Sequence, residues 1–221
     1  MLKRGLIVSC QAEEGSPFNS PEFIVAFARA AEQGGASAVR ICGIDNIKAV
    51  REEILLPIIG ITKEKYPDGS VLITPTVDDC LSIIEAGASV VAADATRRVR
   101  PAGLTGKEMI AKARTMLTAP IMADIATYEE AIEAVERGAD FVGTTLAGYT
   151  RETEGSKTDE PDFELVRRLA ARFPDRVIAE GRIWTPEQAK KMVDLGAHAV
   201  VVGTAITRPV EIVKRFARQI V

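Results

Sequence analysis

Three features of the sequence predict an α/β fold, a single closed (β/α)8 barrel of the TIM-barrel class. Short apolar runs rich in Val and Ile alternate with amphipathic helical segments, which indicates parallel strands covered by helices. A Gly-Ala step that leads into an apolar run occurs four times, at intervals of 51 to 58 residues, about the length of two strand-helix units. One further run between successive repeats brings the strand count to eight, which favours closure. An open doubly wound sheet shares the alternation and is the second candidate.

The eight expected strands follow from these runs. Four of them begin shortly after the glycine of a Gly-Ala step, at Gly35, Gly87, Gly138 and Gly196. The other four are the runs 6–10, 57–61, 120–123 and 177–179. Each repeated glycine stands where a left-handed residue commonly ends a helix, so the next strand should follow at once.

Periodicity and capping signals indicate the helices between the strands. Apolar residues recur on one face of the segment 21–33, with Ser20 as the expected N-cap and Pro21 in the first turn. Capping boxes, in which a Thr is followed three residues later by an acid or an amide, are expected at Thr127–Glu130, Thr185–Gln188 and, more loosely, Thr76–Asp79. The charged pairs 129–130 and 190–191 look like solvated helix faces.

Composition narrows the possible classes of protein. The 221 residues contain no Ser/Pro-rich linker, so one domain covering residues 1–221 is expected. A formal net charge of -3 does not indicate binding to nucleic acid or to an anionic membrane surface. No apolar stretch reaches the ~18 residues of a membrane span, and the N-terminal apolar run is too short for a signal peptide, which favours a soluble cytoplasmic protein. Cys10, Cys42 and Cys80 lack CxxC spacing, so buried reduced thiols are expected.

Polar residues follow the ends of the expected strands, on the rim where (β/α)8 barrels carry out chemistry. In order along the chain they are Gln11, Arg40, Lys63, Asp94, Asp124, Thr144, Thr145, Glu180, Gly203 and Thr204. A solvated rim explains any one of them equally well, but the whole set favours an active site. The glycine turns after the last two strands, Gly181-Arg182 and Gly203-Thr204, predict a phosphate site, because their backbone N–H groups can approach an anion closely. Simple turn formation is the alternative.

Other features point to function less directly. His198, the only histidine, falls at the start of the last strand, away from the expected rim, and is not expected to act in catalysis. The basic run 97–100 is either a substrate-covering loop or a solvated turn. Trp184 either walls the pocket or packs beneath the next helix. Arg208 precedes Pro209 at the entrance of the last helix, where its planar fork would bind two phosphate oxygens; a solvated arginine is the alternative.

Motifs along nearly the whole chain carry a family resemblance. They are Val8-Ser9-Cys10-Gln11, Gln33-Gly34-Gly35-Ala36 with Arg40, the runs 57–63 and 73–76, Asp94-Ala95-Thr96-Arg97, Met122-Ala123-Asp124-Ile125, the run 144–150, Glu180-Gly181-Arg182 and the run 202–209. In these motifs the chain resembles bacterial N-acetylmannosamine-6-phosphate 2-epimerases. The resemblance implies interconversion of N-acetylmannosamine 6-phosphate and N-acetylglucosamine 6-phosphate in amino-sugar and sialic acid breakdown, with no metal and no cofactor.

The resemblance also implies roles for individual residues. Lys63 and Glu180 match the catalytic positions. Substrate contacts are implied for Gln11, Arg40, Asp124, Thr145 and Arg208, and a phosphate cradle for Gly181, Arg182, Gly203 and Thr204. Thr204 departs from members with a second glycine there, although its backbone N–H is still available. The loop 152–161 matches no motif of the family.

The implied reaction explains the residue types. Inverting a carbon next to a carbonyl requires removal of its proton while a cation stabilises the enolate oxygen. A lysine can be the base only if its pKa falls well below about 10.4, through burial or a nearby cation such as Arg40. The hypothesis is that Lys63 transfers the proton at C2, and that Glu180 opens the sugar ring and holds the lysine in register.

Two other functions fit the same sequence. One is a different phosphosugar isomerase; a ribulose-phosphate epimerase would need metal-ligating histidines, for which His198 is badly placed. The other is a non-catalytic, regulatory phosphosugar-binding barrel, which would need the cradle without Lys63 and Glu180. A homodimer is expected, because barrels of this kind often pair through exposed helices.

Overall fold

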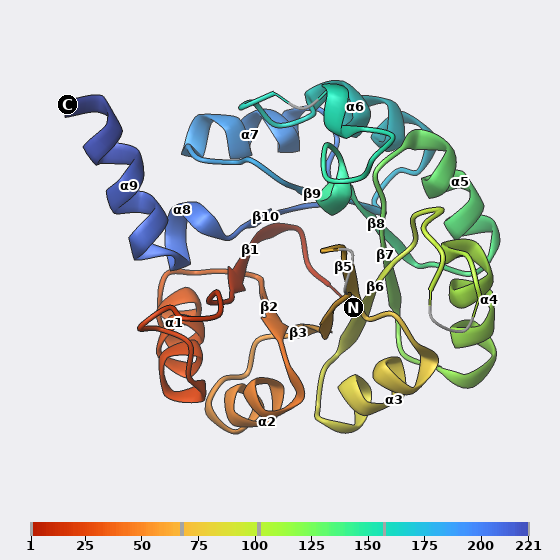
Figure 1. The fold of residues 1–221 in the computed structure, drawn as a ribbon, viewed down its shortest axis with the longest axis horizontal. Helices are drawn as coiled ribbons and strands as arrows, with labels where there is room; N and C mark the ends of the chain where they lie inside the picture. The colour runs from red at the N-terminus through yellow and green to blue at the C-terminus, as the bar shows by residue number, and fades with distance from the viewer. Residues whose placement is uncertain (1, 67–68, 101–102, 157, 221) are drawn as a thin grey trace.

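The computed structural model describes residues 2–66, 69–100, 103–156 and 158–220, and its centre is a closed barrel of eight parallel strands (Figure 1). The barrel strands are β1 (Gly5–Cys10), β2 (Ala38–Cys42), β3 (Ile58–Ile61), β6 (Val90–Asp94), β7 (Ile121–Asp124), β8 (Phe141–Gly143), β9 (Val177–Glu180) and β10 (Ala199–Val202). They follow one another around the barrel in chain order, and β1 pairs with both β2 and β10. The predicted closed barrel is therefore confirmed, and the open sheet is excluded.

Helices surround the barrel (Figure 1). They are α1 (Pro21–Gln33), α2 (Ile44–Glu53), α3 (Val77–Glu85), α4 (Gly106–Met116), α5 (Tyr128–Glu136), α6 (Phe163–Arg172), α7 (Pro186–Asp194), α8 (Thr204–Thr207) and α9 (Pro209–Ile220). Two short 3₁₀ helices, η1 (Thr144–Leu146) and η2 (Glu154–Ser156), lie in the segment after β8. Figure 1 shows α9 projecting away from the ring that the other helices form.

Local signals account for most helix ends. The four repeated glycines are left-handed as predicted, with φ of 84°, 102°, 101° and 99° at Gly35, Gly87, Gly138 and Gly196. The capping boxes that begin at Thr76, Thr127 and Thr185 are all formed. Ser20 occupies the predicted N-cap position of α1, but its buried hydroxyl makes no capping hydrogen bond.

One prediction about a helix surface is wrong. Glu130 is only 2% exposed and is not part of a solvated face. Its carboxylate accepts hydrogen bonds from the backbone N–H groups of Ala126, Thr127 and Arg97, at 2.8, 3.1 and 2.9 Å. Burial raises the pKa of Glu130, although these donors oppose the rise. The capping role draws the side chain inward, which a count of charges along the helix does not reveal.

Apolar side chains form two layers. One layer fills the inside of the barrel and includes Ile7, Ile59 and Ile178, while a larger layer lies between the sheet and the helices. Leu2 belongs to the inner layer, and its carbonyl oxygen lies 3.0 Å from His198 Nε2. His198 thus lies at the N-terminal end of β10, as the sequence predicted.

A small hairpin after β3 was not predicted. It consists of β4 (Lys63–Lys65) and β5 (Val71–Ile73), which pair antiparallel with Lys63 opposite Ile73. A signal for it exists in the sequence, where Pro67-Asp68-Gly69 is a typical turn. Pro67 and Asp68 themselves lie outside the described residues. The hairpin matters for function, because Lys63 is its first residue.

The composition also led to expectations about thiols and membranes. Cys10, Cys42 and Cys80 form no disulfide; the first and last are buried, but Cys42 is only half-buried. No helix within the described ranges is long and apolar enough to cross a membrane.

Candidate active site

A cavity of about 960 Å³ opens at the C-terminal ends of the barrel strands. Eleven residues have a role implied by the family resemblance, and ten of them line the cavity: Gln11, Arg40, Lys63, Thr145, Glu180, Gly181, Arg182, Gly203, Thr204 and Arg208. The eleventh, Asp124, is fully buried next to Arg40 and does not line the cavity. Residues nearly 200 positions apart in the sequence are brought together here by closure of the barrel.

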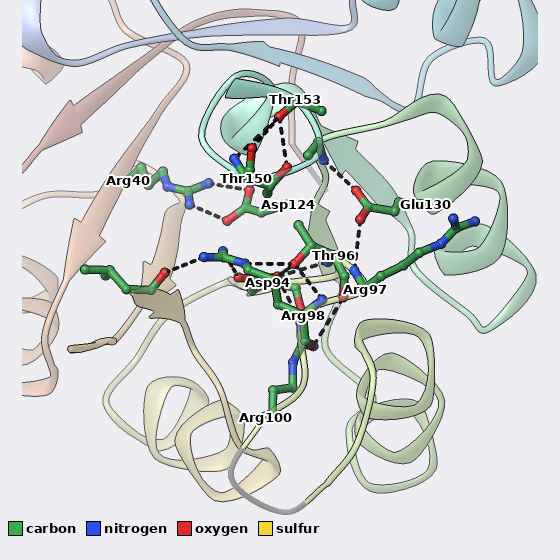
Figure 2. Close-up of polar contacts among 12 residues, drawn as sticks. Arg40, Asp94, Thr96, Arg97, Arg98, Arg100, Asp124, Glu130, Thr150 and Thr153 are labelled. Atoms are coloured by element: carbon green, nitrogen blue, oxygen red, sulfur yellow. Dashed lines mark hydrogen bonds and ion pairs between the residues drawn. The ribbon is translucent and has the colours of Figure 1, made fainter. Parts of the chain in front are cut away.

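A buried ion pair lies at the floor of the cavity. Arg40, 1% exposed, donates through Nη1 to Asp124 Oδ1 at 3.1 Å and through Nη2 to Asp124 Oδ2 at 2.5 Å (Figure 2). The same Nη1 lies 3.1 Å from Glu180 Oε2. Burial alone would lower the pKa of Arg40, but the two carboxylates outweigh burial and raise it. Arg40 therefore keeps a permanent positive charge inside the site.

Glu180 is placed to hold a proton. Burial raises its pKa, and the neighbouring Asp124 raises it further, while Arg40 opposes the rise. Thr145 Oγ1 lies 2.6 Å from Asp124 Oδ1 and 3.2 Å from Glu180 Oε2. One hydroxyl has only one proton, so it can donate to only one carboxylate at a time. A protonated Glu180 relieves the repulsion between the two acids.

Lys63 extends from the base of the hairpin into the cavity. Its Nζ donates to Gln11 Oε1 at 2.8 Å, and Gln11 Nε2 donates to Ser9 Oγ at 2.7 Å, which fixes the amide. The lysine is open to the solvent of the cavity, yet protein atoms surround its ammonium group. This burial lowers the pKa of Lys63 most, and the nearby cations Arg208 and Arg40 lower it further. Lys63 is thus disposed to be a neutral base.

The two glycine turns lie side by side, because β9 and β10 are paired. Gly181 has φ of 113° and Arg182 has φ of 57°, a left-handed conformation that non-glycine residues seldom adopt outside functional sites. The Arg182 guanidinium donates to the carbonyl oxygens of Ala147 and Glu160, at 2.6 and 2.9 Å. Arg182 therefore uses its side chain to hold the segment after β8, and the residue lines the cavity.

Arg208 lines the cavity directly before α9, which begins at Pro209 as predicted. Its Nη1 lies 2.5 Å from Glu13 Oε1, and the two side chains are 27% and 46% exposed. No sequence pattern indicated this partner, because Glu13 lies in a loop at the opposite end of the chain. A guanidinium that is already oriented at the cavity wall remains suited to bind an anion.

Sequence reasoning missed part of the cavity wall. The further lining residues include Val71 and Ile73 of the hairpin, Arg98 from the basic run, and Tyr149 and Arg151 from the segment after β8. Arg98 had a signal, since the run 97–100 was a candidate covering loop, and the hairpin had its turn sequence. Trp184 lines the cavity, which is the first of its two predicted positions.

Acid and base groups are present without a set of metal ligands. In the described part of the chain, no three His, Cys, Asp or Glu side chains group as they would around a metal ion. The Arg40 guanidinium forms ion pairs with both buried acids, Asp124 and Glu180. An amine with a lowered pKa, a carboxyl group with a raised pKa and a fixed cation in one cavity can together move a proton to and from a carbon next to a carbonyl.

Comparison with protein families gives one match that covers most of the chain. Residues 24–221 match the family described as "Putative N-acetylmannosamine-6-phosphate epimerase". A relative from Caldanaerobacter subterraneus subsp. tengcongensis is 50% identical over 219 residues, which are 97% of this chain and 90% of the relative. A relative from Enterobacter sp. is 45% identical over 221 residues, which are 100% of this chain and 94% of the relative. Both are named "Putative N-acetylmannosamine-6-phosphate 2-epimerase".

A solved structure is also similar throughout. The N-acetylmannosamine-6-phosphate 2-epimerase from Clostridium perfringens superposes with a TM-score of 0.91 at 43% sequence identity. The match covers 99% of this chain and 94% of that protein.

Proposed function

The chain belongs to the N-acetylmannosamine-6-phosphate epimerase family, and on that basis we propose that it interconverts N-acetylmannosamine 6-phosphate and N-acetylglucosamine 6-phosphate. The protein is a carbohydrate epimerase of the isomerase class. One observation supports the chemistry most strongly: the pKa of Lys63 is lowered and that of Glu180 is raised in the same cavity, beside the permanently charged Arg40. Opposite pKa shifts in one site are typical of an acid and base pair.

Glu180 opens the sugar ring in this proposal. The hydrogen at C2 becomes acidic only when C1 is a free aldehyde, so the ring must open before C2 can react. The open chain forms when the C1 hydroxyl loses a proton and the ring oxygen gains one. The protonated form of Glu180, which its raised pKa favours, gives that second proton and regains one on ring closure.

Lys63 then takes the proton from C2. The electron pair of the broken C–H bond moves to the C1 oxygen, where Arg40 supplies the positive charge that stabilises the enolate. The Lys63 ammonium gives a proton back to the opposite face of C2 after the open chain has turned within the cavity, so the lysine is neutral again, the aldehyde re-forms and the ring closes. The atoms balance without an oxidant, a reductant or a second substrate. Gln11 holds the Lys63 amine at 2.8 Å during these steps.

The phosphate group anchors the other end of the sugar. We assign it to the backbone N–H groups of the turns Gly181-Arg182 and Gly203-Thr204, with the Arg208 guanidinium beside them. Gly203 is also required by packing, because a side chain there would press on Ser9, with a Cβ only 3.1 Å from Ser9 Cβ. Substrate contacts of Thr145 and Asp124 remain predictions from the sequence. In the structure both residues surround Arg40 and Glu180.

The reaction is also proposed to need no metal and no cofactor, because Arg40 supplies the positive charge that a metal would otherwise provide. Dialysis against a chelator should then leave kcat/KM unchanged. Loss of activity that Mg²⁺ or Zn²⁺ restores would overturn this part of the proposal. A cytoplasmic location, a role in sialic acid breakdown and a single domain over residues 1–221 remain predictions from the sequence.

A homodimer is proposed from the surface of α9. Its residues Val210, Val213, Phe216 and Ile220 lie along one face and are 39%, 66%, 65% and 82% exposed. Helices α7 and α1 also expose a large apolar side chain each, Val193 at 45% and Phe23 at 42%. A second copy of the chain that packs against α9 would bury this apolar face.

Proton NMR of the purified protein in deuterated water tests the proposed reaction. N-acetylmannosamine 6-phosphate should gain deuterium at C2 while the anomeric signals of N-acetylglucosamine 6-phosphate appear. Lys63→Ala and Glu180→Gln should slow the exchange about 100- to 10,000-fold, as expected for removal of a general base or acid, and both should still bind the sugar. Exchange that persists in Lys63→Ala would contradict the assigned base. A wild-type protein that binds the sugar without exchange would be a non-catalytic barrel.

A further inference from the structure

The basic run 97–100 contains three arginines, two of which share the carboxylate of Asp94 (Figure 2). Arg97 faces α5, where its Nη2 donates to Glu133 Oε1 at 3.1 Å. Arg100 is buried and donates through Nη2 to Asp94 Oδ1 at 2.9 Å. Of these three, Arg98 is the one that lines the catalytic cavity.

Asp94 is the fixed point to which Arg98 is attached. This carboxylate is fully buried at the end of β6. Its Oδ1 accepts hydrogen bonds from Thr96 N at 2.9 Å, from Thr96 Oγ1 at 2.6 Å and from Arg100 Nη2 at 2.9 Å. Its Oδ2 accepts from Arg98 Nη2. A buried acid with this many donors is held in one position, and so is the guanidinium paired with it.

Arg98 connects this fixed point to the hairpin. Its Nε donates to Thr96 Oγ1 at 3.1 Å, and its Nη1 donates to the carbonyl oxygen of Val71, in β5, also at 3.1 Å. Within the hairpin, Val71 pairs with Lys65. Ile73, two residues further along β5, pairs with Lys63 in β4. One planar guanidinium therefore joins the end of barrel strand β6 to the hairpin that begins with Lys63.

We propose that Arg98 is a positioning residue for Lys63, an inference that rests on the proposed function. By fastening β5 to Asp94, Arg98 keeps the hairpin in the place where the Lys63 amine meets Gln11 and the reacting carbon. Proton transfer requires such placement, because a shift of about 1 Å can cost about 100-fold in rate. A lysine at position 98 could not replace the arginine, because one ammonium group cannot reach the three acceptors that the guanidinium fork joins.

The kinetic test compares neighbouring arginines. Arg98→Lys and Arg98→Ala should lower kcat about 10- to 100-fold while KM changes little, because the phosphate contacts are made elsewhere. Arg97→Ala is the matched control: it removes a positive charge from the same loop, but its partner Glu133 faces away from the cavity, so kcat should not change. A rise in KM with kcat unchanged in Arg98→Lys would make Arg98 a substrate contact and overturn the proposal.

The second test measures the pKa of the Lys63 amine. The rate at which an amine reagent modifies Lys63 is followed against pH by mass spectrometry, which gives the pKa of the amine in each variant. A loosened hairpin lets water reach the amine, so its lowered pKa should rise towards the ordinary value in Arg98→Lys. That variant keeps the positive charge, which removes the electrostatic explanation. An unchanged Lys63 pKa in both Arg98 variants would count against positioning.

Hydrogen exchange of backbone amides tests the link between Arg98 and the hairpin without a measurement of turnover. Backbone amides of residues 63–65 and 71–73 should exchange faster in Arg98→Ala than in the wild type, with Arg97→Ala as reference and circular dichroism to check that each variant is folded. Should Arg98→Ala fail to fold, Arg98→Lys supplies the same comparison. If the wild type shows no exchange at C2 of the sugar, the proposed function fails but the hairpin measurement still decides the link. Equal amide exchange in all variants would overturn the link itself.

Discussion

Arg40 lies next to two buried acids, one of which must carry a proton in the proposed reaction. A single guanidinium faces both Asp124 and Glu180, so two ionised carboxylates would leave an excess negative charge in a buried place. A proton on Glu180 restores the balance there, and the same guanidinium disfavours a proton on Lys63. Burial and Asp124 thus favour the acid form of Glu180 although Arg40 opposes it, while burial, Arg208 and Arg40 favour the base form of Lys63. Both forms are needed for epimerisation.

This balance predicts the pH dependence of the reaction. Neutral Lys63 is the base, so activity should be lost as the pH falls and the amine takes up a proton. Because its pKa is lowered from the ordinary value of about 10.4, the ascending limb should lie at lower pH than that of an ordinary lysine. At higher pH, activity should fall again as Glu180 loses its proton, later than an ordinary carboxyl group would because its pKa is raised.

A bell-shaped profile of kcat/KM against pH is therefore expected. Glu180→Gln provides the control, since an amide does not titrate. Its residual activity should rise with pH and then stay level, without the descending limb. A descending limb that persists in Glu180→Gln would show that another group is the acid.

Arg208 is predicted to recognise the phosphate. Arg208→Lys should raise KM more than it lowers kcat, and Arg208→Ala should be worse, because a point charge cannot reproduce a two-pronged contact. A charge-assisted contact of this kind is worth about 1.5 to 3 kcal/mol, or about 10- to 100-fold in kcat/KM. Steady-state kinetics with the phosphorylated sugar and with N-acetylmannosamine measure this effect. An equal loss for both sugars would mean that Arg208 does not contact the phosphate.

The barrel elements were predictable from the sequence because they repeat one physical pattern. Apolar strands covered on both sides and helices closed by left-handed glycines leave a signal in every unit. The β4–β5 hairpin breaks this pattern: β4 reads Lys-Glu-Lys and is exposed, so a search for apolar runs passes over it. The same limit applies within the site. Strand ends place Arg40 and Glu180 on the rim, whereas Glu13 meets Arg208 only through the path of a loop.

Gly106, the first residue of α4, packs against the backbone that leads into the loop of Arg98. Replacing this glycine should therefore destabilise the protein. A Cβ at Gly106 would lie 2.3 Å from the carbonyl carbon and oxygen of Ala95 and 2.4 Å from the oxygen of Thr96. Backbone atoms cannot move aside as a flexible side chain can. Gly106→Ala should therefore lower the free energy of unfolding by about 1 to 3 kcal/mol. That corresponds to about 2 to 4 °C in Tm per kcal/mol for a chain of this size.

Calorimetry of Gly106→Ala beside Gly155→Ala tests the prediction for α4. Gly155 has no heavy atom within 4 Å of its would-be Cβ and no positive φ, so its variant should unfold like the wild type. Equal Tm values for Gly106→Ala and the wild type would mean that the loop and the helix can separate without cost. Such freedom would also weaken the case for Asp94 as a fixed point.

Closure of the barrel brings together residues from both ends of the chain, yet the last helix remains outside this arrangement. No residue of α9 is buried, although Val213 and Phe216 continue an apolar face along it. Its Arg215 guanidinium lies 4.4 Å from the centre of the Trp184 ring, and Trp184 lines the cavity. The position of α9 therefore affects the wall of the active site as well as the surface of the molecule.

The proposed dimer leads to a prediction for this helix. Phe216→Asp places a charge in the apolar face, so the protein should sediment near the 23.8 kDa of one chain, while the wild type sediments at twice that mass. Gln219→Asp adds the same charge to an exposed polar position of the same helix and should remain a dimer. Because α9 would lose its partner in Phe216→Asp, the contact of Arg215 with Trp184 should loosen and KM should rise while kcat changes less. A wild type that sediments as a single chain at micromolar concentration would contradict the dimer, and the exposed stripe on α9 would then need another partner.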